Sequence, residues 1–154
     1  LITEKYLKKK FGKKLLILRI SNIIGYKKNT KNHLHKTFID YFYKNAKRGI
    51  IFDNEKRFKD FISVKKFCQL LEMAIKRNLY GIYNLSIGRK VYLNNLIRWL
   101  NKYNKKKIKV IKLREYKEVN FYLNNNKLMK RIRIKNTLEE LKTECVNLSK
   151  KLFN

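Results

Sequence analysis

Proline is absent from the sequence, and its five glycines lie singly rather than in a cluster. A loop that wraps a phosphate needs several glycines within a few residues, so the chain contains no such loop. Only two cysteines are present, Cys68 and Cys145, each among apolar residues at helical spacing. This setting predicts buried thiols in a reducing compartment and no disulfide. No apolar run approaches the roughly 18 residues of a membrane span, and no signal-peptide pattern occurs, so we expect a cytoplasmic protein.

Acidic residues are also scarce, since 11 Asp and Glu face 40 Lys and Arg, for a net charge of +29 at pH 7. One interpretation is a basic nucleic-acid-binding protein, because lysines neutralise phosphates and release counterions. The other is compositional bias, because Lys, Asn and Ile are abundant everywhere. The lysines lie in short runs, such as 8–10 and 105–107, and singly on nearly every predicted element. This spread favours bias and makes nucleic acid the less favoured partner.

Apolar residues make up 44% of the 154 residues, enough for one compact unit with a sizeable core. Their spacing predicts helices over 1–11, about 34–48, 65–77, 93–103 and from 137 onward, and strands over 15–20, 49–52, 58–64, 81–86 and 107–113. The strand 15–20 is predicted as a continuous apolar run, which is typical of a strand covered on both faces, and 81–86 is predicted as a second buried strand. Strands that alternate with helices predict the α/β class with a mostly parallel sheet.

Several side chains carry more specific expectations. Ser63 is predicted to cap the helix 65–77, and Thr137 with Glu140 forms a capping-box pattern at the last helix. Trp99 lies off the apolar stripe of its helix, which leaves an exposed ring or a contact with a substrate domain open. His33 and His35 lie two apart without a third ligand nearby, so we expect a solvated loop and no metal site.

The two apolar strands end in similar sequences, RISNIIG at 19–25 and IYNLSIG at 82–88. Ligands of open α/β sheets bind outside the carboxyl ends of the strands. Asparagine carries both a hydrogen-bond donor and an acceptor, and it also tolerates the irregular backbone of a strand end. Each asparagine is therefore either a loop residue or part of a binding site, and neither strand alone decides between these interpretations.

Four segments in order resemble the C-terminal half of the extended short-chain dehydrogenase/reductase family, the NAD(P)-dependent epimerases and dehydratases of nucleotide sugars. They are TEKYL (3–7), LRISNIIG (18–25), RFKDFISV (57–64) and GIYNLSIG (81–88). The first resembles the helix after the family's catalytic Tyr-x-x-x-Lys, in which a glutamate follows the lysine by four residues. Glu4 would place that lysine just before Leu1.

The resemblance implies that the chain consists of two structural parts. Residues 1–25 and 81–88 would form the last strands of a Rossmann-like parallel sheet, with its N-terminal half missing. Residues 26–80 and 89–154 would form a small α/β substrate-binding domain. The intact protein would be an enzyme with NAD or NADP as cofactor, a nucleotide sugar as substrate, a place in polysaccharide biosynthesis and the capacity to form a homodimer.

The resemblance also implies roles for individual residues. Ile20 and Ser21 would line the nicotinamide end of the cofactor, mainly through backbone, and Asn22 would hydrogen-bond the sugar nucleotide. Lys59 stands where the family has an arginine that meets the substrate's phosphates, and Arg57 lies two residues earlier on the same face of the predicted strand. For both basic residues, a solvated edge strand remains an equal alternative.

Two departures from the family pattern limit the expectation. Lys66 stands where the family usually has an aspartate, and no Tyr-x-x-x-Lys occurs in the expected arrangement. The catalytic tyrosine and lysine are therefore expected upstream of Leu1, and the chain alone is expected to be inactive. The sequence does not determine the particular sugar, the choice between NAD and NADP, or whether the reaction is epimerisation, dehydration or reduction. A stand-alone structural module is a further alternative for the chain.

Overall fold

The computed structural model describes residues 2–25, 38–53, 57–112, 120–134 and 137–153. Its helices are α1 (Ile2–Phe11), α2 (Phe38–Arg48), α3 (Val64–Lys76), α4 (Leu93–Leu100), α5 (Asn126–Ile132) and α6 (Leu138–Phe153), with a 3₁₀ turn η1 (Gly12–Lys14) after α1. Its strands are β1 (Leu16–Ile20), β2 (Asn22–Ile24), β3 (Ile50–Asp53), β4 (Phe58–Lys59), β5 (Phe61–Ser63), β6 (Gly81–Leu85), β7 (Val91–Tyr92) and β8 (Lys109–Lys112).

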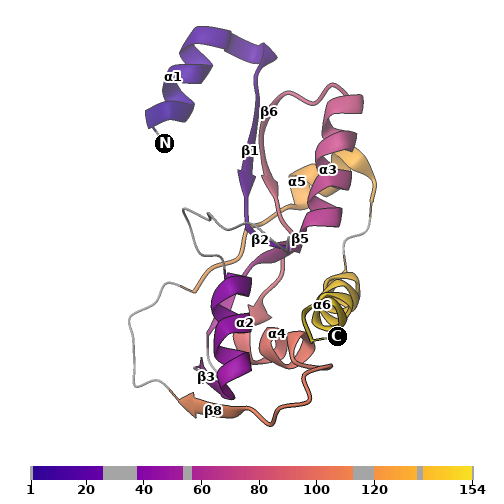
Figure 1. Cartoon of the computed structure of the whole chain (residues 1–154). Coiled ribbons are helices and arrows are strands. Elements are labelled where there is room, and N and C mark those ends of the chain that lie inside the picture. Colours follow the sequence, from indigo (N-terminus) through magenta and orange to yellow (C-terminus); the bar gives the residue numbers. More distant parts are fainter. Residues whose placement is uncertain (1, 26–37, 54–56, 113–119, 135–136, 154) are drawn as a thin grey trace.

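The described strands form pairs. β1 with β6, β2 with β5, and β3 with β8 are parallel, whereas β4 with β7 is antiparallel. In Figure 1, β1 and β6 run side by side toward β2 and β5, with α3 and α5 nearby, while α2, α4 and α6 lie on the other side of β2 and β5. The predicted α/β class and the predominance of parallel pairing are therefore confirmed.

The predicted strand over 58–64 is in fact two strands, β4 and β5, which are separated at Asp60. Helix α3 begins at Val64, and its predicted cap is confirmed because the Lys66 N–H donates to Ser63 Oγ at 3.2 Å. β2, β7 and α5 were not predicted; the first two span only 3 and 2 residues, too few to show a periodic pattern.

The prediction that strand 15–20 is covered on both faces is wrong. Leu16 to Leu18 are only half-buried, and Ile20 is 47% exposed. Helix α1 buries none of its residues, and its apolar residue Ile2 is 87% exposed. A bidentate ion pair at the surface links α1 to β1, in which Arg19 Nε and Nη2 donate to the Glu4 carboxylate at 2.9 and 2.6 Å.

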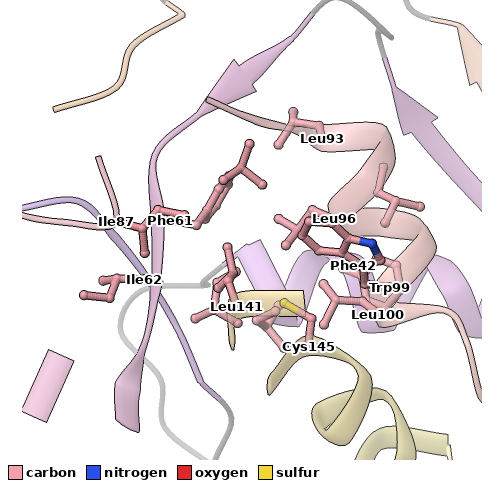
Figure 2. Close-up of a cluster of buried hydrophobic side chains, with 14 of the residues drawn as sticks. Phe42, Phe61, Ile62, Ile87, Leu93, Leu96, Trp99, Leu100, Leu141 and Cys145 are labelled. Carbon is pink, nitrogen blue, oxygen red and sulfur yellow. The ribbon is translucent and has the colours of Figure 1, made fainter. Parts of the chain in front are cut away.

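The hydrophobic core gathers side chains from α2, α3, α4, α5 and α6 and from strands that include β5 and β6. Figure 2 shows part of this core, with labelled side chains from α2, α4, α6 and β5 and with Ile87, which follows β6. Cys145 lies in this core as predicted, whereas Cys68 is exposed, contrary to prediction. Trp99 is only 8% exposed, which excludes the exposed ring. Helix α4 is buried on more than one stripe because both α2 and α6 pack around it; Figure 2 shows Trp99 within the cluster.

The predicted capping box is confirmed at the start of α6. The Glu140 N–H donates to Thr137 Oγ1 at 3.2 Å, and the Thr137 N–H donates to Glu140 Oε2 at 3.0 Å. The two contacts satisfy backbone donors that the first helical turn leaves without partners. His33 and His35 lie outside the described residues.

Candidate functional site

Three of the segments that the sequence singled out meet at one place, where β1 passes into β2. The Ser21 N–H donates to the carbonyl oxygen of Leu85, the last residue of β6, at 3.2 Å. The next residue, Asn22, donates its backbone N–H to the Asp60 carbonyl oxygen at 3.2 Å. The strand ends of RISNIIG and GIYNLSIG are thereby joined to the middle of RFKDFISV, at the carboxyl end of the β1–β6 pair (Figure 1).

Asn22 is exposed, and its side chain is held in one orientation. Its Nδ2 donates to the same Asp60 carbonyl oxygen at 2.9 Å. A primary amide has two N–H groups and one oxygen acceptor. The contact with Asp60 uses one N–H, so the other N–H and the Oδ1 atom remain to meet a ligand. Asn22 does not begin a loop, because it is the first residue of the short strand β2.

Ile20 and Ser21, the predicted cofactor residues, differ in exposure. Ile20 presents an apolar side chain at the end of β1, whereas Ser21 is only 7% exposed. The Ser21 Oγ atom is buried and has no hydrogen-bond partner among the described residues. Ile20 therefore offers side-chain surface for an apolar ring face, and Ser21 can contribute little besides its backbone.

The predicted phosphate residues, Arg57 and Lys59, are half-buried rather than fully solvated. Lys59 lies opposite Val91 in the antiparallel β4–β7 pair, and the Arg57 carbonyl oxygen accepts from the Leu93 N–H at 2.9 Å. Lys59 directly precedes Asp60, whose carbonyl oxygen holds the Asn22 side chain. The fold thus places Lys59 one residue from the backbone group that orients Asn22.

Asp60 is the residue that the site prediction missed. It is fully buried, and its carboxylate accepts from the N–H groups of Ile87, Gly88 and Leu123 at 3.1 to 3.2 Å. Burial raises the pKa of the Asp60 carboxyl, and these three backbone donors oppose that rise. An aspartate directly before the apolar residues Phe61 and Ile62 of a predicted strand is the signal that could have identified it.

Lys66, where the resembling family has an aspartate, forms an ion pair instead. It is 9% exposed, and its Nζ lies 3.0 Å from Glu140 Oε1 on α6. Burial opposes ionisation of Glu140, but the Thr137 N–H and Lys66 lower its pKa overall. A buried lysine needs such a partner. The Lys66–Glu140 ion pair therefore links α3 to α6, and its role is structural.

A pocket of about 720 Å³ lies beside the site, between the end of β2, the start of α3, and α6. Ile23 and Gly25 line it from β2 and the residue that follows, Val64 and Lys65 line it from α3, and Lys151 lines it from α6. A Cβ atom on Gly25 would lie 2.4 Å from Val64 Cγ2, so glycine is required for this close approach. The five predicted site residues are not among its described lining. In the part of the chain that the structure describes, no group of three or more His, Cys, Asp or Glu residues could hold a metal ion.

The strand-end site lies in an α/β fold of mostly parallel strand pairs. Solved structures with this fold match nearly the whole chain. UDP-N-acetylglucosamine 4-epimerase from Methanobrevibacter ruminantium M1, in complex with UDP-N-acetylmuramic acid, has a TM-score of 0.71 at 18% identity, over 97% of this chain and 49% of that one.

Two further structures give the same result. RMD from Pseudomonas aeruginosa, complexed with NADPH, has a TM-score of 0.71 at 13% identity, over 96% of this chain and 50% of that one. dTDP-glucose 4,6-dehydratase from Bacillus anthracis str. Ames, in complex with NAD, has a TM-score of 0.66 at 16% identity, over 97% and 49%. No family model and no curated protein matches the sequence.

The chain thus has the fold of about half of an NAD-dependent epimerase or dehydratase, in agreement with the four-segment resemblance. It spans about half the length of these solved structures. At this level of identity the likeness establishes the fold alone. In the described part of the chain, no helix combines the length and hydrophobicity that a membrane crossing requires.

Proposed function

We propose that the chain is the substrate-holding half of an NAD(P)-dependent nucleotide-sugar epimerase, dehydratase or reductase. The observation that carries the proposal is the junction of Ser21, Asn22, Asp60 and Leu85, where three segments far apart in the sequence meet at the carboxyl ends of parallel strands. Ligands of open α/β sheets bind at that edge.

In this proposal Asn22 contacts the sugar nucleotide through the N–H and the Oδ1 atom that point away from Asp60. Lys59 and Arg57 supply positive charge for the diphosphate, and a lysine serves there as a point charge rather than as a bidentate fork. Holding the diphosphate fixes the sugar against the cofactor, which is the entropic part of catalysis.

NAD or NADP would supply hydride transfer when bound. This chain would meet the nicotinamide end with the exposed side chain of Ile20 and with the backbone of Ser21. A glycine-rich loop and an acid/base tyrosine would come from a nucleotide-binding half, which we place beside β1. In the same proposal, residues 1–25 and 81–88 belong to the Rossmann-like part, and 26–80 and 89–154 to the substrate-binding part.

Titration of the chain with UDP, followed by NMR or calorimetry, tests the proposal. Asn22→Ala and Lys59→Ala should each weaken UDP binding about tenfold, the loss of one hydrogen bond to a charged group. Asn45→Ala is the matched control, because the Asn45 side chain donates within its own helix to the Tyr41 carbonyl oxygen. Absence of UDP binding, or equal affinity in all three variants, would contradict the proposal.

A further inference from the structure

We propose that Asp60 is a positioning residue, whose buried carboxylate fixes the backbone that orients Asn22. The inference rests on the proposed function and deepens it, because it assigns the orientation of the substrate-binding amide to a residue that does not itself face the ligand. Two sets of contacts, one at the Asp60 backbone and one at its side chain, carry it.

The backbone of Asp60 acts directly on Asn22. One carbonyl oxygen accepts both the Asn22 backbone N–H at 3.2 Å and the Asn22 Nδ2 at 2.9 Å. A carbonyl oxygen has two lone pairs, so it can accept both bonds at once. The direction of the Asn22 amide therefore depends on where the Asp60 carbonyl group lies.

The carboxylate of Asp60 holds that carbonyl group in place. Oδ1 accepts from the Ile87 N–H at 3.2 Å, and Oδ2 accepts from the Gly88 and Leu123 N–H groups, each at 3.1 Å. Ile87 and Gly88 follow β6, and Leu123 precedes α5. Asp60 thereby ties the start of β5 to two other segments, while its carbonyl oxygen ties it to β2.

The segment after β6 is itself fixed, so it can act as an anchor. The Asn125 Nδ2 donates to the Ser86 carbonyl oxygen at 2.8 Å, and Gly88 has a φ of +70°. A Cβ atom on Gly88 would lie 2.4 Å from Asn125 Oδ1. Glycine is therefore needed for the Gly88 N–H to reach Asp60, and only a carboxylate of aspartate length offers two oxygens to three donors here.

The test combines Asp60→Asn with Asn22→Ala in the 154-residue chain. Asparagine keeps the shape but replaces one acceptor oxygen by an NH₂ group that faces backbone donors. We expect Asp60→Asn to shift the Asn22 side-chain amide resonance and to weaken UDP binding about tenfold. In the double variant, UDP binding should be no weaker than in Asn22→Ala alone, because both changes remove the same interaction.

Thr137→Ala serves as the control, since it weakens the start of α6 without touching this site. It should leave the Asn22 amide resonance and UDP affinity unchanged. An unshifted Asn22 resonance in folded Asp60→Asn, or additive losses in the double variant, would overturn the inference. If the unaltered chain does not bind UDP, the proposed function fails, while the Asn22 resonance still decides the role of Asp60.

A second variant decides the matter if Asp60→Asn does not fold. Gly88→Ala leaves Asp60 intact but displaces the Gly88 N–H from its carboxylate, because of the positive φ and the contact with Asn125. We expect the same Asn22 side-chain resonance to shift. An unchanged resonance in Gly88→Ala would show that the carboxylate does not control the orientation of Asn22.

Discussion

The two cysteines show how far a single residue's chemistry depends on its surroundings. Cys145 lies in the core, where burial, with a smaller contribution from Glu144, raises the pKa of its thiol to about 12. Cys68 is exposed on α3, although the helical spacing predicted a buried residue there. The sequence pattern places a residue on a stripe, but the width of the buried stripe is set by what packs against the helix. For α3 that stripe is narrow, and Ile75 is 60% exposed as well.

Thiol labelling distinguishes these two residues. At pH 8 the folded chain should react with Ellman's reagent at one cysteine, Cys68, because the thiolate is the nucleophile and a pKa of about 12 leaves Cys145 protonated and enclosed. Two thiols should react in denaturant. The control variant Cys68→Ser should show none in the folded state; rapid labelling of Cys145 in that variant would contradict the burial described here.

At the scale of elements, the sequence predicted what short-range chemistry determines. The caps at Ser63 and Thr137 were predicted correctly, because a cap depends on a few neighbouring residues. The break of the strand 58–64 at Asp60 was not predicted, because its cause is a set of donors from Ile87, Gly88 and Leu123. Those donors are distant in the sequence, so no local sequence pattern predicts their contact with Asp60. The position of Asn22 at the end of a strand could therefore be predicted from the sequence, whereas its contact with the Asp60 carbonyl oxygen could not.

The capping box at α6 gives a quantitative prediction. Thr137→Ala removes the acceptor for the Glu140 N–H and should lower the free energy of unfolding by about 1 kcal/mol. Thr143→Ala, an exposed position within the same helix, is the matched control and should change the free energy by less than about 0.5 kcal/mol. Urea denaturation of both variants measures the difference, and equal effects would mean that the box does not stabilise α6.

At the scale of the whole molecule, the exposed lysines of the described residues are distributed rather than gathered. They occur on α1, α3, α5 and α6, which favours compositional bias over a nucleic-acid site as the origin of the charge.

The burial of apolar side chains, in contrast, is uneven. Core residues come from α2, α3, α4, α5, α6 and the strands near them, whereas α1 contributes none and β1 only partly buried ones. A pocket of about 420 Å³ also lies between η1 and the first residues of β1 and β6.

The uneven burial of apolar side chains predicts which backbone amides of the chain alone exchange slowly. Local stability follows buried apolar contact, so amides of α4 and α6 should be the most protected and those of α1 should exchange close to the unstructured rate. The Glu4–Arg19 pair will not prevent this, because exposed ion pairs contribute little. Exchange measured by mass spectrometry, with Arg19→Ala as a comparison, should show similar rapid exchange of α1 in both chains. Under the proposed function, a nucleotide-binding half that covers β1 should slow exchange in α1 and β1 while leaving α4 unchanged. Strong protection of α1 in the chain alone would mean that this surface is already stable without a covering partner.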